Sequence, residues 1–138
     1  MSARKLEAEP IHLGRGGTAV VQPPFTGMEW YAAYVERHGD DGAEGRLVSL
    51  HRFETDWDMW EMHPRGAEVV VCLSGALVLH QEAEGGARKT IALKPGEYAI
   101  NPPGTWHTAD VPEPAAALFV TAGEETQHRP RQAKFSGK

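Results

Sequence analysis

Short segments rich in Val, Leu, Ile, Thr and aromatic residues run along most of the chain, and glycine- and proline-rich turn signals separate them. Short strands with this regular punctuation are typical of a β-sandwich or β-barrel. The pattern therefore predicts an all-β fold. The predicted strands lie near residues 18–22, 46–53, 58–63, 67–74, 76–82, 89–94, 97–101, 105–110 and 116–121.

One segment near the N-terminus has a helical pattern instead of an extended one. In MEWYAAYVERHG, residues 28–39, apolar and aromatic side chains recur at helical spacing, and Gly39 is a suitable residue to end the helix. We expect one short N-terminal helix that packs on the barrel. No internal repeat or linker interrupts the chain, so residues 1–138 are expected to form a single domain. The recurring helical residues are Trp30, Tyr31, Tyr34 and Val35.

The composition is that of an ordinary globular domain, and it narrows the range of partners. Of the 138 residues, 41% are hydrophobic and 24% are charged, and a net charge of −5 argues against a nucleic-acid-binding surface. No stretch reaches the roughly 20 apolar residues of a membrane span. The start of the chain lacks the apolar core of a secretory signal. We therefore expect a soluble, cytoplasmic protein without nucleic-acid or membrane partners.

Two further features have simple structural interpretations. Cys72 is the only cysteine, so no disulfide forms within the chain, and its apolar neighbours predict a place in the core. Residues from about 128 to 138 carry the only cluster of one charge sign. A short basic terminus of this kind is typically solvated and poorly ordered, so we expect a flexible basic tail at 128–138.

Charged residues stand just before the most apolar run of the chain. The stretch WEMHPRGAE precedes VVVCL and carries Glu61, His63 and Glu68. A buried carboxylate is costly unless it is paired or bound to a metal. Side chains two apart in a strand share a face, so Glu61 and His63 point the same way. A tight return at the following Pro-Arg-Gly turn can bring Glu68 beside His63.

A fourth candidate ligand lies downstream. GEYAINPPGTWH, residues 96–107, predicts a strand, a Pro-Pro-Gly turn and a second strand that carries His107. Proline fixes its own backbone dihedral, and glycine adopts conformations that other residues disfavour, so the turn is rigid. A hairpin of this kind presents His107 at a reproducible position.

The spacing of these residues resembles the two motifs of the cupin superfamily. His63 is followed after four residues by Glu68 and after six more by Gly75, as in the second half of the first cupin motif. The resemblance covers a motif core at 61–107 and implies a small single-domain cupin with a jelly-roll β-barrel. The second motif is matched without a gap by Gly96, Pro102, Gly104 and His107.

Two positions depart from the pattern of the family. The first motif of the family opens with His-x-His, whereas this chain has Glu61, Met62 and His63. The Asn that usually closes the second motif is replaced by Val111. The change at Glu61 matters more, because it falls on a metal ligand of the family.

The resemblance implies metal ligands at His63, Glu68 and His107, with Glu61 in place of the first histidine. Two imidazoles and two carboxylates balance the charge of a divalent ion and suit Fe, Mn, Ni or Zn. Two alternatives stay open. Either the cupin has lost its metal and Glu61 is solvated at the barrel mouth, or Glu61 swings free and acts as a catalytic general base. The second alternative requires an apolar pocket that raises the pKa of Glu61 toward neutrality.

The cupin fold hosts many chemistries, so the resemblance does not select one function. We expect a metal-binding cupin that acts on a small organic molecule, with a dioxygenase as the first hypothesis. The alternatives are an isomerase or lyase and a cupin that only binds a small-molecule ligand. The resemblance also points to a homodimer. Segment 11–25, with its predicted strand at 18–22, is the candidate contact, because unpaired strand edges are commonly paired or covered.

The other histidines and aromatic residues are weaker candidates for the site. Three histidines near predicted ends or loops are most simply surface residues: His12, His38 and His128. Two more lie in predicted strands, where they can point into the barrel: His51 and His80. Three aromatic residues flank the candidate ligands and either wall a pocket or fill the core: Trp57, Trp106 and Tyr98.

Overall fold

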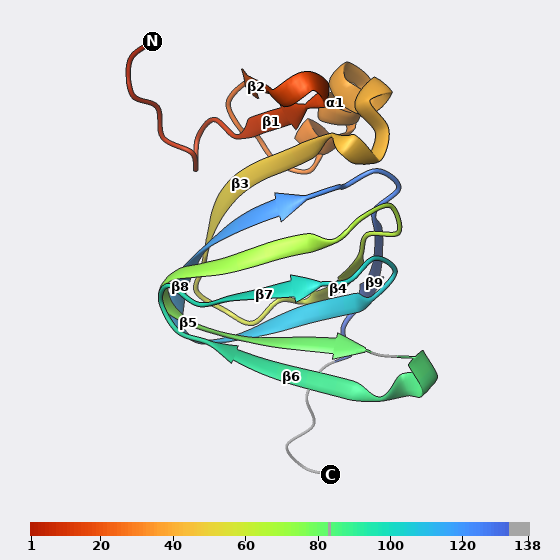
Figure 1. The fold of residues 1–138 in the computed structure, drawn as a ribbon. Helices are drawn as coiled ribbons and strands as arrows, with labels where there is room; N and C mark the ends of the chain where they lie inside the picture. The colour runs from red at the N-terminus through yellow and green to blue at the C-terminus, as the bar shows by residue number, and fades with distance from the viewer. Residues whose placement is uncertain (83, 133–138) are drawn as a thin grey trace.

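The computed structural model describes residues 1–82 and 84–132, and hydrogen bonds link nine strands in this part of the chain (Figure 1). The strands and one short α-helix form the jelly roll that the sequence predicts. No helix among these residues is long and apolar enough to cross a membrane. The elements are β1 (Ile11–Gly14), the 3-10 helix η1 (Arg15–Gly17), β2 (Thr18–Val21), α1 (Glu29–His38), η2 (Gly39–Glu44), β3 (Arg46–Phe53), β4 (Met59–Met62), β5 (Glu68–Glu82), η3 (Glu84–Gly86), β6 (Arg88–Leu93), β7 (Tyr98–Asn101), β8 (Trp106–Thr121) and β9 (Gln127–Pro130).

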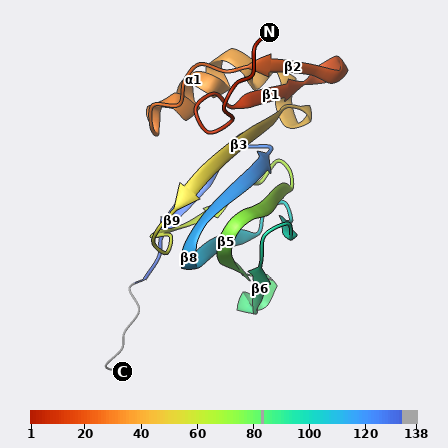
Figure 2. The same ribbon diagram turned by 90° about the vertical axis from the view of Figure 1, so that its left-hand side faces the viewer.

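Two long strands, β5 and β8, bend and take part in both sheets of the jelly roll (Figures 1 and 2). The first sheet has the order β2-β1-β3-β8-β5-β7 and uses the second half of β8 and the first half of β5. The second sheet has the order β9-β4-β8-β5-β6 and uses the other halves. All of these pairs are antiparallel, so the two long strands tie the sheets together.

The bends in β5 and β8 meet at Gly75. This glycine has a φ of 72°, and a side chain here would clash with the carbonyl oxygen of Pro114. The register between the two strands shifts at three places around the bend, so hydrogen bonding continues through it. The sequence pattern predicts two strands at 67–74 and 76–82, and two more at 105–110 and 116–121. In the structure each of these pairs is one continuous strand, β5 and β8.

The inward faces of both sheets form the main hydrophobic core. Val70 and Cys72 before the bend, and Leu77 and Leu79 after it, are fully buried. The inward positions of β5 change from even to odd residue numbers across the bend, as expected when a bulge adds an unpaired residue. Burial of each leucine side chain contributes about 1.5–3 kcal/mol. Cys72 lies in this core, as predicted.

The N-terminal elements β1, β2 and α1 gather at one end of the barrel, next to β3 (Figures 1 and 2). The helix confirms the prediction for residues 28–39. Its Trp30 and Tyr34 rings stack with centroids 5.5 Å apart and form a second apolar cluster with Leu47 of β3. The helix is therefore held against the barrel by its aromatic face.

His12 is buried, and the expectation of a surface residue is wrong. Its side chain is 2% exposed and is hydrogen-bonded to the Tyr34 hydroxyl and to the Asp41 carboxylate, both at 2.6 Å. The His38 ring stacks on it with centroids 4.0 Å apart. His12 lies near the N-terminal end of the sequence, but the docking of α1 and η2 on β1 buries it. Its hydrogen bonds to Tyr34 and Asp41 hold these elements together.

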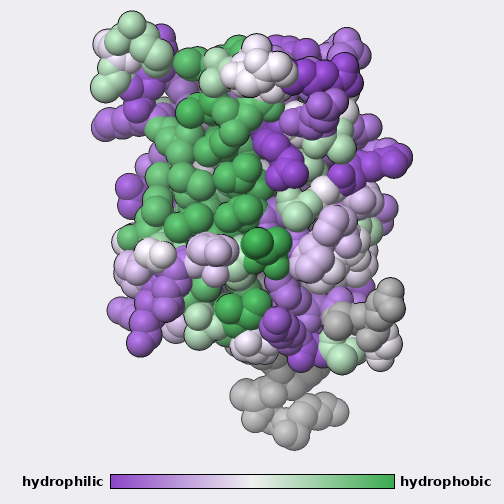
Figure 3. Space-filling view, viewed as in Figure 1, coloured by the Kyte–Doolittle hydropathy of each residue, from purple (hydrophilic) through white to green (hydrophobic). Residues whose placement is uncertain are grey.

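The outer face of the first sheet is apolar. Ile100 is 50% exposed and Leu73 is 42% exposed on this face. Figure 3 shows a continuous hydrophobic area that runs from top to bottom over the left half of the face seen in Figure 1. The strand register aligns one apolar residue from each strand in a single row: Val21, Ile11, Val48, Val120, Val69 and Ile100.

The end of the described chain differs from the expected flexible tail. Residues Gln127–Pro130 form β9 and pair with β4. The Arg129 guanidinium lies over the rings of Trp60 and Trp106, 5.1 and 4.5 Å from their centroids, and Arg131 forms an ion pair with Asp110. Basic residues thus attach this segment to the barrel, while most of its side chains stay exposed. The rest of the predicted tail, residues 133–138, lies outside the described residues.

Candidate metal centre and pocket

The four predicted ligands converge inside the barrel. Glu61 lies on β4 and His63 follows that strand, so both point to the same side. Glu68 begins β5 after the short turn, and His107 lies near the start of β8, directly opposite Glu61 in the ladder. One ligand atom from each residue lies within 4.8 Å of every other. Neighbouring strands thus deliver the four groups to one point.

The distances between the ligand atoms suit a single ion. Nε2 of His63 lies 3.4 Å from Oε1 of Glu61 and 3.3 Å from Oε2 of Glu68. Nε2 of His107 lies 3.6 Å from Oε1 of Glu61 and 3.2 Å from Oε1 of Glu68. Ligands about 2.0–2.2 Å from a tetrahedral ion are separated from each other by roughly 3.3–3.6 Å. The spacing therefore leaves room for a metal ion between the four groups.

Both imidazole rings are oriented by their other nitrogen. Nδ1 of His63 is hydrogen-bonded to the Thr126 hydroxyl at 2.8 Å, and Nδ1 of His107 donates to the Thr105 carbonyl at 3.2 Å. The two Nε2 atoms are buried, and within the described part of the chain they have no hydrogen-bond partner of regular geometry. A nitrogen that is held in place and left unsatisfied is typical of a histidine that binds a metal.

Glu68 is also held by its neighbours. Its side chain is 3% exposed, and it accepts hydrogen bonds from Thr121 at 2.7 Å and from Asn101 at 3.1 Å. Gln81 in turn donates to the Asn101 side-chain oxygen at 2.8 Å. The carboxylate therefore enters the core already oriented toward the two histidines.

The histidines and carboxylates of the site shift one another's pKa toward the charged forms. Burial alone would lower the pKa of His63 and of His107, but the neighbouring carboxylates of Glu61 and Glu68 outweigh it and raise the pKa of each ring to about 9. Burial alone would raise the pKa of Glu68, but His107 and His63 outweigh it and lower that pKa to about 2. Without a metal, protonated histidines compensate the two carboxylates, so a divalent cation would replace two protons.

His128 joins the site, although the sequence suggests a surface position. Its Nε2 lies 3.3 Å from Oε2 of Glu61, because β9 pairs His128 with Glu61 across the ladder. Glu61 is the most exposed of the four ligand candidates, with a side chain 32% exposed. Burial would raise the pKa of Glu61, but His107, His128 and His63 outweigh burial and hold that pKa well below its usual range.

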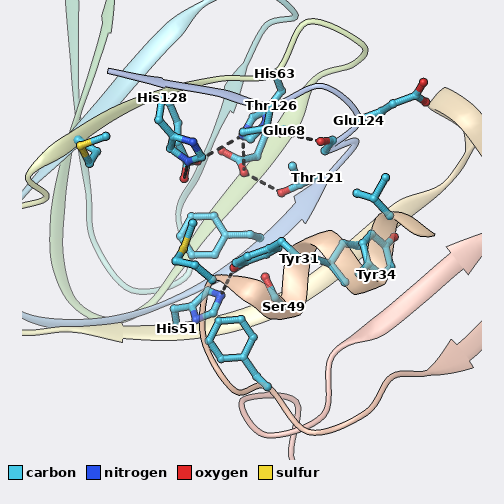
Figure 4. Close-up of a pocket in the computed structure, with 18 of the residues that line it drawn as sticks. Tyr31, Tyr34, Ser49, His51, His63, Glu68, Thr121, Glu124, Thr126 and His128 are labelled. Carbon is cyan, nitrogen blue, oxygen red and sulfur yellow. Dashed lines mark hydrogen bonds and ion pairs between the residues drawn. The ribbon is translucent and has the colours of Figure 1, made fainter. Parts of the chain in front are cut away.

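A pocket of about 940 Å³ opens beside these residues, between the barrel and α1 (Figure 4). Glu61, His63 and Glu68 line one part of it, and Tyr31 of α1 faces them from the other. The Tyr31 hydroxyl is hydrogen-bonded to Nε2 of His51 at 3.4 Å. Burial, together with the charges of Glu61 and Glu68, raises the pKa of Tyr31 to about 12. The site is therefore accessible to a small molecule.

The other candidates divide between the pocket and the outside of the barrel. Trp57 and His51 line the pocket. His80 is instead hydrogen-bonded to Asp110 at 2.9 Å, and Tyr98 is 63% exposed on the outer face. Trp106 packs under Arg129 away from the site. The sequence did not single out Thr121, Thr126 or Asn101, since their roles depend on contacts between distant strands.

Comparison with known proteins agrees with this arrangement. A family model described as "Cupin domain" matches residues 51–123, which is more than half of the chain. The chain belongs to the cupin family. No curated protein matches this cupin. The family match spans the ligand candidates on β4, β5 and β8, and these form a site of the kind that holds a divalent metal ion.

Several solved structures share the fold of this cupin. Oxalate oxidase is 16% identical with a TM-score of 0.51, and the match covers 59% of this chain but only 44% of that chain. Oxalate decarboxylase is 17% identical with a TM-score of 0.54, over 70% of this chain and 26% of that chain. Hydroquinone 1,2-dioxygenase from Sphingomonas sp. TTNP3 is 23% identical with a TM-score of 0.45, over 54% and 57% of the two chains. At these identities the matches show the fold alone, and this cupin spans less than half the length of the oxalate oxidase.

Proposed function

We propose that this cupin is a metal-dependent enzyme that acts on a small organic molecule, with dioxygenase as the leading activity. One observation carries the proposal. The four ligand candidates converge with two unsatisfied imidazole nitrogens, and three of them, Glu61, His63 and Glu68, line a pocket large enough for a small substrate. A site that served only to stabilise the barrel would have no need of that opening.

The residues present fit a divalent ion. His63, His107 and Glu68 would hold it, and Glu61 would supply the fourth ligand. Mixed nitrogen and carboxylate ligands suit Fe, Mn, Ni or Zn. A bound ion of this kind would polarise a chelating substrate or, as iron, manganese or nickel, support chemistry with oxygen. Thr126, Thr105 and Thr121 keep the ligands oriented toward the ion position.

Glu61 is the metal-ligand candidate that we place next to the substrate. It lies at the pocket side of the site, and His128 holds its second oxygen. Oε1 of Glu61 lies 3.4 Å from Nε2 of His63 and 3.6 Å from Nε2 of His107, a spacing that suits a shared ion, so we favour Glu61 as a metal ligand over Glu61 as a general base. His128 is then a positioning residue for this carboxylate.

The test is reconstitution of the metal-free protein with Fe(II), Mn(II), Ni(II) and Zn(II), followed by oxygen uptake and turnover on diketones, catechols and keto acids. We expect one metal per chain in the wild type, loss of metal in His107→Ala, and oxygen consumption with at least one substrate. Turnover without oxygen uptake would instead indicate the isomerase or lyase alternative. No turnover with any metal, together with a metabolite that copurifies, would indicate a binding protein.

We also propose a homodimer. Strand β2 lies at the edge of the first sheet, all four of its residues are exposed, and the apolar row on the outer face runs up to it. An unpaired edge next to an exposed apolar face favours contact with a second copy of the chain. The proposed contact therefore includes the predicted segment 11–25 and extends over the outer face.

A further inference from the structure

We propose that the pocket selects a flat aromatic molecule that carries oxygen donors but no carboxylate. This inference rests on the proposed function, because it names the class of substrate for the same site. It follows from three properties of the pocket: its aromatic walls, the sign of the charges around it, and the neutral polar groups inside it.

Aromatic rings from three parts of the chain wall the pocket. The rings of Phe53 and Trp57 lie 5.4 Å apart, and each lies 6.1 Å from the ring of Phe119. Phe25 and Tyr31 face them from the N-terminal segment, with centroids 5.5 Å apart. Flat aromatic surfaces pack well against such rings in offset or edge-to-face geometry. The walls therefore favour a planar ring over a small, fully hydrated molecule.

The charges that line the pocket are predominantly negative. Besides the two carboxylates of the metal site, five further acidic side chains line it. Histidines aside, Arg52 is the single cationic side chain among the described lining residues, and it is already paired with Glu7 at 3.1 Å. A divalent ion would cancel only the charges of Glu61 and Glu68. Glu125 is likewise paired with Arg65, so its charge is largely compensated. The other four acids repel an anionic substrate. They are Glu54, Asp56, Asp58 and Glu124.

Apart from the metal site and the acidic side chains, the pocket offers neutral hydrogen-bonding groups. Tyr31 and Ser49 offer hydroxyls, and His51 contributes an imidazole whose pKa is lowered by burial (Figure 4). Hydroxyl and imidazole groups suit a phenolic or carbonyl oxygen, whereas carboxylate recognition typically uses arginine in a two-pronged contact. The interior therefore matches oxygen donors on an uncharged ring.

Three matched probes test the proposal on the zinc-loaded protein, which does not turn over by redox chemistry. Catechol carries a flat ring with two oxygens, 3,4-dihydroxybenzoate adds a carboxylate, and cis-cyclohexane-1,2-diol keeps the oxygens without the aromatic ring. Binding is followed by calorimetry and by tryptophan fluorescence. We expect catechol to bind at least about tenfold more tightly than either of the other probes.

The double substitution Glu54→Gln and Asp58→Asn tests the charge argument, because both residues lie at the exposed rim and neither is a metal ligand candidate. It should reduce the difference in affinity between catechol and 3,4-dihydroxybenzoate without weakening the binding of catechol. Equal or tighter binding of 3,4-dihydroxybenzoate or of oxalate by the wild type would overturn the proposal, as would equal binding of the cyclohexane diol.

Metal content is measured first, so that a failure of the proposed metal-dependent function can be distinguished from a failure of the proposed substrate class. If zinc binds at one ion per chain and catechol does not bind, the substrate class is wrong while the metal site stands. If zinc does not bind, the proposed metal-dependent function is wrong. The same titrations on the metal-free protein then decide the substrate class, since the aromatic walls and the acidic rim do not depend on the ion.

Discussion

Replacing Thr121 by valine tests whether the neighbours of Glu68 set the affinity of the site for metal. The substitution keeps the shape and the burial of the side chain but removes the hydroxyl that donates to Oε2 of Glu68 at 2.7 Å. Thr121 and Asn101 are the two side chains outside the candidate ligands that donate to this carboxylate. Asn101 still donates to the other oxygen at 3.1 Å, so one of these two hydrogen bonds is lost. The carboxylate is then free to rotate away from the histidines.

The size of the effect follows from the strength of that bond. A hydrogen bond to a charged group contributes about 1.5–3 kcal/mol, and each 1.4 kcal/mol corresponds to about tenfold in affinity. Removal of such an orienting partner typically lowers metal affinity about 10–100-fold. Because Asn101 remains, we expect Thr121→Val to weaken binding by about tenfold, toward the lower end of that range.

The assay is competition for Zn(II) or Mn(II) against a chromophoric chelator, with thermal unfolding measured in parallel. Thr121→Ser retains the hydroxyl and should restore most of the affinity. Thr108→Val is the matched control, since it removes a buried hydroxyl on the same strand that donates to the Met59 carbonyl at 2.9 Å. It should lower stability but leave metal affinity within about threefold. A folded Thr121→Val variant with wild-type affinity would refute the reasoning.

Three further predictions concern the scaffold. Gly75→Ala should lower the free energy of unfolding by roughly 2–5 kcal/mol in denaturant titrations, because it combines a positive φ with a backbone clash. Asp110→Asn should lower the melting temperature at pH 7 but not near pH 2. Burial opposes ionisation of Asp110, yet His80 and Arg131 outweigh burial and lower its pKa to about 2. The stability that the ionised carboxylate contributes is therefore present above about pH 4 and is lost as the pH falls toward 2. Light scattering at micromolar concentration should give a dimer, and a lysine introduced at Ile100 on the outer face should give a monomer; a monomeric wild type would contradict the proposed contact.

The parts of the site that the sequence predicts are those fixed by local geometry. Alternation along a strand places Glu61 beside His63, and a short turn returns the chain to Glu68. A rigid turn sets the position of His107. These relations involve near neighbours in the sequence, whereas the meeting of His107 with the other three ligand candidates was implied by the resemblance to the two cupin motifs and depends on the pairing of β4 with β8.

The residues that the sequence missed depend on pairing between distant segments. His128 faces Glu61 because β9 pairs with β4, and nothing in the composition of a basic C-terminal segment indicates that pairing. His12 is buried by the docking of a helix that follows it in the chain. The continuity of β5 and β8 was also missed, since Gly75 interrupts the apolar pattern as a turn would, although here it marks a bulge.

The assembly of the site from β4, β5, β8 and β9 has a consequence for how the protein acquires its metal. Glu61 emerges early in synthesis, but its partners His107 and His128 are made much later, on strands that must pair with β4 from a distance. Closure of such long loops makes the pairing slow. A nascent chain still attached to the ribosome, with β9 not yet available, would present only part of the ligand set. The complete set of groups around Glu61 is therefore expected to form only after β8 and β9 have paired with β4, so we expect metal binding to follow the folding of these strands.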